Sequence, residues 1–301
     1  MNVHRRAAST IVRAPAKLNL FFEVFAKRSD GYHEVETLMV PIGLADEVVA
    51  SPEPSGAVIV HCDWAMPGGD ADTTLGVLPA AKENLATKAL GLLRARASVS
   101  AGIRLDIIKR IPSAAGLGGA SSDAAAALVA ANELWNLGWS RLALTALAAE
   151  LGSDVPFFLY DGAAVCRGRG ERIEPIEGLP ALDYVVVRPP EGLATAQVYA
   201  RCEVPREPRR VDTLVSALRH GETRRLRGLL YNRLQNAAAA LSCWIQRLER
   251  EFAREDCLAA QMSGSGSSYF GICRHARHAR RVARRLRARG VGQVYAVRGC
   301  G

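Results

Sequence analysis

The sequence lacks the features of a membrane or secreted protein. Its longest apolar runs, such as residues 124–131, are far shorter than the roughly 20 residues that a bilayer-spanning helix needs. The first ten residues contain two arginines and no apolar segment, so neither a secretory signal nor a transit peptide is expected. We therefore expect a cytoplasmic protein that does not associate with membranes.

Paired cysteines are also missing. The seven cysteines are an odd number, and none stands in the CxxC spacing of zinc knuckles or redox motifs. This pattern argues against a disulfide framework, which small secreted domains use in place of a large core. We expect reduced thiols at positions 62, 166, 202, 243, 257, 273 and 300.

Acidic residues are absent from one basic segment near the C-terminus. Residues 274–289 hold eight arginines and no Asp or Glu, and without these eight the chain has 31 basic residues against 30 acidic ones. Apolar residues recur there at helical spacing, which predicts an amphipathic helix with a basic outer face: Ala276, Ala279, Val282, Ala283 and Leu286. A solvated face is the favoured interpretation, and an anionic partner such as nucleic acid is the alternative. Nucleic acid is disfavoured because Phe, Tyr and Trp, on which single-stranded bases stack, do not interleave with the arginines.

The overall composition is that of a globular protein. The chain has 301 residues, 49% hydrophobic and 23% charged, and this length suggests two domains or one large domain. In the first half, β-branched or alternating runs predict strands separated by turn-rich segments, one of them at residues 43–46. Helical periodicity also occurs, with Ser140 as a favourable N-cap residue. The expected strands are 11–26, 33–42, 46–51, 57–64 and 102–111, and the expected helices are 83–96, 121–135 and one that begins after Ser140.

The domain boundary is expected near residue 165. Residues 166–180 are dense in Gly and Pro, which favours an irregular connection between domains. After it, periodicity predicts a strand, three amphipathic helices and a closing strand, at 182–190, 211–254 and 293–299. Elements in this order predict an α+β sandwich with two domains, residues 1–165 and residues 166–301.

A glycine-rich segment carries the clearest functional signal. Pro112 ends the strand before it, and Gly116, Gly118 and Gly119 allow backbone angles and close approach that side chains would prevent. The small-residue helix 121–135 follows at once. A helix N-terminus presents free N–H groups and the positive end of the helix dipole, which suits a di- or triphosphate. No Lys follows the glycines as in the Walker motif, so a tight turn packed against a sheet is the structural alternative.

Three further segments carry groups suited to phosphate chemistry. Lys17 and Asn19 stand two positions apart in a predicted strand, hence on one face, where an amine and an amide could reach the same ligand. Residues 262–271 contain a second Gly/Ser loop, which could bind phosphate or close a plain hairpin. Asp154 follows a predicted helix end and precedes apolar residues, so it is a candidate general base, with a helix-terminal cap as the alternative.

These four segments together resemble a known kinase family. In this order, PAKLNL, PSAAGLGGASSDAA, GSDVPFF and MSGSGSS are similar to segments of galactokinase, homoserine kinase, mevalonate kinase and phosphomevalonate kinase, over nearly the whole chain. The resemblance implies a two-domain α+β sandwich, with an N-terminal ribosomal-protein-S5-like domain and a C-terminal ferredoxin-like domain. It also implies phosphoryl transfer to an alcohol with ATP and Mg²⁺. Two segments resemble one group of kinases within this family: residues 30–48 and the Gly-Ser-Asp-Val-Pro sequence at 152–156. Kinases of that group phosphorylate the 2-hydroxyl of 4-diphosphocytidyl-2-C-methyl-D-erythritol in the non-mevalonate route to isoprene units.

The resemblance also implies roles for individual residues. Lys17 and Asp154 would be catalytic, the first beside the acceptor hydroxyl and the second as its base. Cytosine would lie between two aromatic rings with a histidine at its edge. The substrate-binding residues would then be Asn19, Tyr32, His33 and Tyr199. The ATP-binding residues would be Pro112, Ser113, Ala114, Ala115, Gly116, Leu117, Gly118, Gly119, Ala120, Ser121 and Ser122.

Three alanines depart from the pattern of the family. Ala114, Ala115 and Ala120 stand where relatives often have glycine, and alanine is compatible with the loop unless a positive φ is required there. Some relatives also have a magnesium-binding serine at the position of Ala120. The sequence therefore assigns no metal ligand, and it does not indicate an oligomeric state.

Three other functions compete with this interpretation. The first is another small-alcohol kinase of the same family, for example one acting on homoserine or mevalonate, but those kinases lack the Gly-Tyr-His tripeptide that ends at His33. The second is a basic nucleic-acid-binding protein, because the N-terminal architecture of these kinases recurs in ribosomal proteins. The third is an inactive, ligand-sensing relative, which the presence of both Lys17 and Asp154 disfavours.

Overall fold

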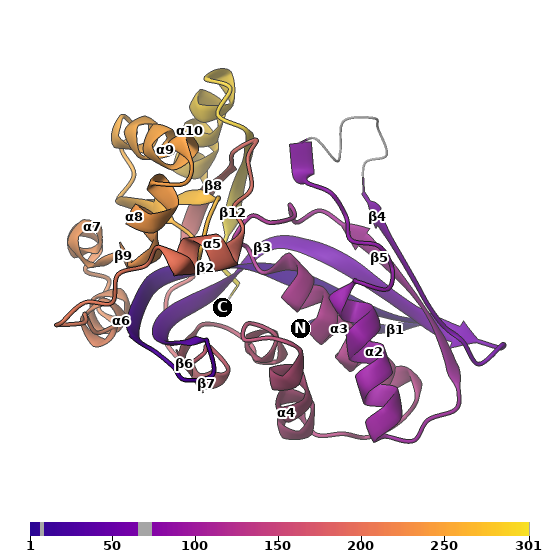
Figure 1. The fold of residues 1–301 in the computed structure, drawn as a ribbon. Coiled ribbons are helices and arrows are strands. Elements are labelled where there is room, and N and C mark those ends of the chain that lie inside the picture. Colours follow the sequence, from indigo (N-terminus) through magenta and orange to yellow (C-terminus); the bar gives the residue numbers. More distant parts are fainter. Residues whose placement is uncertain (7–8, 66–73, 301) are drawn as a thin grey trace.

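Two β-sheets with helices packed against them make up the structure, a computed structural model that describes residues 1–6, 9–65 and 74–300 (Figure 1). The strands are β1 (Val3–Arg6), β2 (Ser9–Lys27), β3 (His33–Glu53), β4 (Val58–Trp64), β5 (Gly102–Lys109), β6 (Ala164–Gly168), β7 (Arg172–Pro175), β8 (Asp183–Arg188), β9 (Tyr231–Asn232), β10 (Ala259–Met262), β11 (Tyr269–Cys273) and β12 (Gln293–Arg298). The first sheet runs β1-β2-β3-β5-β4, and in addition β6 pairs with β3, β7 with β6 and β9 with β2. The second sheet is antiparallel and runs β10-β11-β8-β12.

Helices occupy the sequence between these strands. They are α2 (Leu85–Arg96), α3 (Gly119–Leu134), α4 (Arg141–Leu151), α5 (Thr195–Ala200), α6 (Asp212–Arg219), α7 (Leu226–Leu229), α8 (Leu234–Ala239), α9 (Cys243–Ala253) and α10 (Ala276–Ala288). The side chain of Ser140 accepts a hydrogen bond from the N–H of Ala143, as its predicted capping role requires. Residues 211–254 contain four α-helices in place of the three that the periodicity predicts. No helix in the described part of the chain is both long and apolar enough to cross a membrane.

Strands β2 and β3 form one long antiparallel hairpin at the centre of the molecule (Figure 1). The prediction of a turn at residues 43–46, between two shorter strands, is wrong, because β3 continues through them. The pairing shifts between Pro15 and Ala16, whose partners are Ala45 and Ile42, so Gly43 and the residue after it form a bulge. The turn-forming residues at this point therefore bend a strand and do not end it.

Three cores hold the layers together. Helices α2, α3 and α4 cover one face of the first sheet, and most of the buried residues of α3 are alanines, which allow close packing. The second sheet packs on β2 and β3 through side chains such as Leu18, Tyr184 and Phe270. Its other face is covered by α9 and α10, with Val185 and Val282 in the core between them. The α+β sandwich predicted from the sequence is thereby confirmed.

Residues 164–175 extend the first sheet. Strand β6 pairs with β3 and β7 pairs with β6, in a segment whose Gly and Pro content predicts an irregular connection. Gly168 and Gly170 have positive φ values of 75° and 116°, which allow the tight turn between β6 and β7. The chain passes to the second sheet between Pro175 and Asp183. The division into domains at residue 165 stays a prediction.

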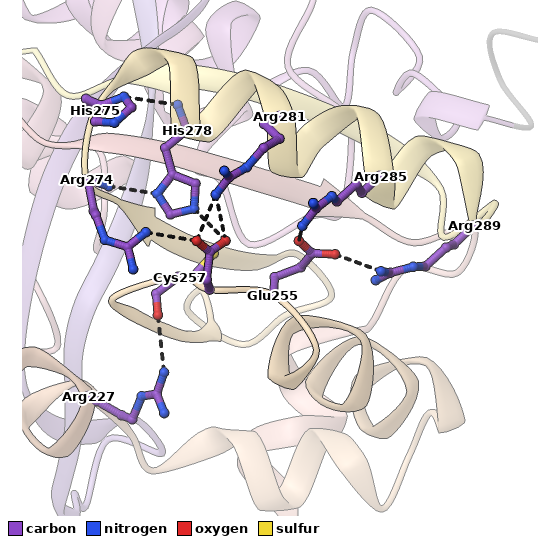
Figure 2. Close-up of polar contacts among 10 residues, drawn as sticks. Arg227, Glu255, Cys257, Arg274, His275, His278, Arg281, Arg285 and Arg289 are labelled. Atoms are coloured by element: carbon purple, nitrogen blue, oxygen red, sulfur yellow. Dashed lines mark hydrogen bonds and ion pairs between the residues drawn. The ribbon is translucent and has the colours of Figure 1, made fainter.

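The arginine-rich segment forms the amphipathic helix α10, as predicted. Its buried residues include Ala279, Val282, Ala283 and Leu286, and it packs against the second sheet. Figure 2 shows that arginines of this segment reach acidic side chains in the segment that follows α9. The ion pairs are Arg274 and Arg281 with Asp256, Arg285 and Arg289 with Glu255, and Arg289 with Glu251. Four of the eight arginines are thus engaged in ion pairs with three carboxylates.

Candidate active site

A cavity of about 970 Å³ lies beside the glycine-rich loop. Lining residues come from residues 112–121, from β2, from the β2–β3 hairpin, from the β6–β7 turn, from α5 and from the β10–β11 loop. Segments that are far apart in the sequence therefore meet here. The volume lies at the upper end of the range of about 300 to 1,000 Å³ that is typical of small-molecule sites.

The glycine-rich loop enters α3 at Gly118, which caps the helix with a φ of 73°. Gly116 has a φ of 70°, and a Cβ there would lie 2.4 Å from the carbonyl oxygen of Ser263. The N–H of Ser268 donates to the carbonyl of Ala115. The β10–β11 loop is therefore at once a hairpin turn and a support for the glycine-rich loop, so the two Gly/Ser segments form one assembly.

Ala114 adopts a backbone conformation that favours glycine. Its φ is 50°, in the left-handed region, whereas Ala115 is not among the residues with positive φ and Ala120 lies within α3. Of the three alanines that depart from the family pattern, Ala114 is therefore strained. The strain is local, because the residue is exposed at the surface of the loop.

We expect Ala114→Gly to stabilise the protein by about 1 kcal/mol, because glycine adopts a positive φ without a steric cost. Urea denaturation measures the change in the free energy of unfolding. Ala120→Gly is the matched control, since the same substitution inside a helix should destabilise by up to about 1 kcal/mol. Destabilisation by both substitutions would contradict the assignment of strain to Ala114.

Lys17 and Asp154 lie together at the cavity. The Nζ atom of Lys17 is 3.4 Å from Oδ2 of Asp154, and only 3% of Lys17 is exposed. The same Nζ donates to Oδ1 of Asn19 at 2.5 Å, and Nδ2 of Asn19 donates to Oγ1 of Thr37 at 2.8 Å. A Cβ on Gly264, in the β10–β11 loop, would lie 3.2 Å from this Nζ. The ammonium group is thus held on several sides and directed at a carboxylate whose side chain is 33% exposed.

A buried charge cluster supports the loop from behind. Lys109 donates to Asp46 and, at 2.6 Å, to Asp123. The other oxygen of Asp46 accepts hydrogen bonds from the backbone N–H groups of Arg110 and Ile111. Burial raises the pKa of Asp123, and the Lys109 ammonium acts in the opposite direction. The cluster ties β3, the end of β5 and α3 together and so fixes both ends of the loop.

Sequence reasoning missed this cluster, although a signal was present. Lys109 stands at the end of an alternating apolar strand, directly before the loop, and Asp123 interrupts a run of alanines in a helix. Charged residues at such positions need partners when they are buried. The partner Asp46 lies in a segment that reads as a turn, so local patterns do not reveal the pairing.

Aromatic side chains gather at another part of the cavity. Tyr32, 51% exposed, directly precedes β3, and His33 is the first residue of that strand. The ring of Tyr199, from α5, lies 5.0 Å from the His33 ring, with 32° between their planes. Burial, and then the charge of Lys27, lower the pKa of His33, so its imidazole is neutral at pH 7. Burial raises the pKa of Tyr199, and the Asp154 carboxylate adds to this rise.

Several side chains beside the loop carry oxygen atoms that could contact a metal ion. Ser121, Asp154 and Asp123 line the cavity, and Oδ1 of Asp123 has no hydrogen-bond partner among the described residues, whereas Ala120 offers no side-chain oxygen. The buried hydroxyl of Ser122 has no hydrogen-bond partner among the described residues. That part of the chain also contains no cluster of three or more His, Cys, Asp or Glu side chains that could hold a metal ion. A metal ion here would be held by such side-chain oxygens together with oxygen atoms of a phosphate ligand, as Mg²⁺ commonly is.

The structure brings most of the predicted site residues to this one cavity. Ser122 and Asn19 are exceptions, because both are fully buried and neither lines the cavity. Asn19 lies behind Lys17, so its contact with a substrate stays a prediction. The predicted residues that line the cavity are Lys17, Tyr32, His33, Asp154, Tyr199 and residues 112–121.

Two protein-family models match the chain. The model described as "GHMP kinases N terminal domain" matches residues 84–162, which include the glycine-rich loop and Asp154. The model described as "GHMP kinases C terminal" matches residues 214–292, which include the β10–β11 loop and α10. The glycine-rich loop, Asp154 and the β10–β11 loop therefore fall within matched segments, whereas Lys17, the aromatic residues and the β6–β7 turn lie outside them.

Curated proteins resemble the chain over most of its length. A 4-diphosphocytidyl-2-C-methyl-D-erythritol kinase from Pelotomaculum thermopropionicum is 42% identical over 276 residues, which cover 91% of this chain and 92% of that protein. A protein of the same name from Shouchella clausii is 39% identical over 289 residues, covering 95% and 93%.

Solved structures show the same likeness. A crystal structure of 4-(cytidine 5'-diphospho)-2C-methyl-D-erythritol kinase superimposes with a TM-score of 0.78 at 36% identity and covers 97% of this chain and 99% of its own. The mevalonate kinase of L. major, in complex with R-mevalonate, has a TM-score of 0.74 at 18% identity and covers 99% and 97%. At that lower identity the likeness shows a shared fold alone.

Proposed function

The chain belongs to the GHMP kinases and, among them, to the 4-diphosphocytidyl-2-C-methyl-D-erythritol kinases, and we propose that it transfers the γ-phosphoryl group of ATP to the 2-hydroxyl of that diphosphocytidyl substrate. One observation carries the proposal. A single cavity contains a Lys–Asp pair, a helix-capping glycine loop and a group of aromatic rings. The reaction needs three corresponding parts: a site for the acceptor hydroxyl, a site for the ATP phosphates and a site for the cytosine ring.

Lys17 and Asp154 would carry the chemical step. The hydroxyl oxygen forms a bond to the γ-phosphorus while the bond from that phosphorus to the β–γ bridging oxygen breaks, and ADP leaves. Asp154 accepts the hydroxyl proton. Lys17, 3.4 Å from that carboxylate, adds positive charge beside the transferring group. Asn19, which donates a hydrogen bond to Thr37, accepts one from the ammonium and holds it in place from behind.

The ATP phosphates would lie on the glycine-rich loop. The N-terminus of α3 supplies free N–H groups and a positive dipole end, and Gly116 and Gly118 keep the backbone accessible. Ser121, Asp123 and Asp154 are oxygen donors that would assist in holding Mg²⁺, together with the phosphates. When bound, Mg²⁺ neutralises part of the phosphate charge.

The cytosine would bind at Tyr32, His33 and Tyr199. Stacking uses the tyrosine rings, and the neutral imidazole of His33 can both donate and accept hydrogen bonds at the edge of the base. The Gly-Tyr-His tripeptide distinguishes this chain from kinases that act on homoserine or mevalonate.

The cytoplasmic location of the protein stays a prediction.

Substrate choice tests the proposal directly. We expect ATP consumption with 4-diphosphocytidyl-2-C-methyl-D-erythritol to exceed that with mevalonate or homoserine by several orders of magnitude in kcat/KM. Without the cytidylyl group, the binding energy of the aromatic site is not available. Comparable turnover of mevalonate or homoserine would favour the other small-alcohol kinases.

The pKa of His33 predicts a pH dependence of substrate binding. The KM for the cytidylyl substrate should stay constant from pH 8 to pH 6.5 and rise only below this, because burial lowers the pKa of His33 from 6.5. Lys27→Gln removes a positive charge that also lowers this pKa. The rise should therefore begin at a higher pH in this variant. The KM for ATP, measured over the same pH range in both proteins, should not show this rise. If the KM for ATP rose together with the KM for the cytidylyl substrate, the titrating group would be one other than His33.

The ion pairs of the arginine-rich segment, residues 274–289, argue against nucleic acid as a partner. Arg277, Arg280 and Arg284 have no polar partner among the described residues, whereas four other arginines of the segment are already in ion pairs. We expect labelled RNA to bind weakly at low salt and not detectably at physiological salt, because such attraction depends on counterion release. Fluorescence anisotropy measures this. Tight binding at physiological salt that is lost when these three arginines become Gln would restore the nucleic-acid alternative.

A further inference from the structure

The β6–β7 turn spans the distance between the aromatic rings and the Lys–Asp pair. The guanidinium carbon of Arg169 lies 4.8 Å from the centroid of the Tyr32 ring. At the next residue, a Cβ on Gly170 would lie 3.8 Å from Oδ1 of Asp154 and 3.5 Å from Cβ of Ser153. Both turn residues line the cavity. Two consecutive residues thus touch the two ends of the site.

The turn leaves most of the hydrogen-bonding capacity of the Arg169 guanidinium free. Glu171 organises the turn, because its carboxylate accepts a hydrogen bond from the backbone N–H of Arg169 at 2.6 Å. The Nε atom of Arg169 forms a long ion pair with that carboxylate at 3.9 Å, a distance too long for a hydrogen bond. Its remaining polar contact is a long one, 3.4 Å, to the carbonyl of Ala149. The neighbouring Asp30 is bound by Arg28.

We propose that Arg169 binds the diphosphate of the nucleotide substrate and so positions the acceptor hydroxyl at Asp154. This inference rests on the proposed function. A substrate with its cytosine at Tyr32 and its hydroxyl at Asp154 must place the diphosphate between them, where Arg169 lies. A guanidinium group matches two phosphate oxygens at once, and it offsets the repulsion between the diphosphate and the Asp154 carboxylate.

Binding of cytidine and of CDP separates the phosphate contact from the base contact. By calorimetry, Arg169→Gln should weaken CDP binding by about 10- to 100-fold, as expected for charge-assisted hydrogen bonds. Cytidine binding should not change. Arg169→Lys should restore part of the CDP affinity, because it keeps the charge without the forked geometry. Arg172→Gln, three residues away and paired with Glu34 outside the cavity, is the matched control and should bind CDP like the parent.

Steady-state kinetics provide the second measurement. Arg169→Gln should raise the KM for the diphosphocytidyl substrate and leave the KM for ATP unchanged.

Two outcomes of the binding measurements would overturn the proposal. Equal losses of cytidine and CDP affinity in Arg169→Gln would show that Arg169 only supports the Tyr32 ring. Unchanged CDP affinity in Arg169→Gln would also overturn the proposal. If the parent protein turns over the substrate normally, either result leaves the proposed function intact; a parent that neither binds CDP nor turns over the substrate would remove both.

Discussion

Asp154→Asn is expected to lower kcat by about 10²- to 10⁴-fold, the usual cost of losing a general base, while the Kd for ATP stays near its parent value. Asparagine has nearly the shape of aspartate but cannot accept the hydroxyl proton. The glycine-rich loop and α3, which would bind the phosphates, do not change. Rapid-quench or steady-state assays give kcat, and calorimetry with a non-hydrolysable ATP analogue gives the Kd.

Asp161→Asn is the matched control for that experiment. This carboxylate lies in the same segment but does not line the cavity; it binds the N-terminal ammonium and Arg141. Its side chain is 68% exposed, so the substitution should leave kcat near the parent value. A kcat within a few-fold of the parent for Asp154→Asn would show that another group, or solvent, takes the proton.

The residues of the candidate site that could be predicted are those that local patterns encode. Lys17 and Asn19 share a face because they are two positions apart in a strand, and the glycine spacing before α3 marks a helix N-terminus. The structure places Lys17, Asp154 and residues 112–121 around one cavity. The spacing did not show, however, that Asn19 is fully buried behind Lys17.

Features that depend on distant contacts could not be predicted in the same way. Residues 43–46 read as a turn, yet Asp46 is held by Lys109 and by two backbone N–H groups at the end of β5, so the strand continues. Arg169 lies in a Gly-rich segment that resembles an irregular connection, but pairing with β3 turns that segment into strands. In both cases partners far along the chain decide the local structure, which propensity alone does not capture.

The second large effect is expected at Gly116. Gly116→Ala should weaken ATP binding by about 100-fold or more. A Cβ at this position would lie 2.4 Å from the carbonyl oxygen of Ser263 and 2.8 Å from that of Gly266, and backbone atoms cannot move aside as a flexible side chain can. The loop would have to leave the β10–β11 hairpin. Loss of two N–H contacts to charged phosphate oxygens, at about 1.5 to 3 kcal/mol each, corresponds to at least this factor.

Gly116→Ala introduces both backbone strain and a steric clash, and Gly138→Ala serves as the control that introduces strain alone. The φ of Gly138, 67°, is nearly the same as the 70° of Gly116, but nothing lies within 4 Å of a Cβ built there. Gly138→Ala should therefore cost about 1 kcal/mol of stability and leave the Kd for ATP unchanged. Circular dichroism and thermal melts establish that both variants are folded. If folded Gly116→Ala binds ATP as Gly138→Ala does, the phosphates do not lie on this loop, and the β10–β11 loop becomes the next candidate.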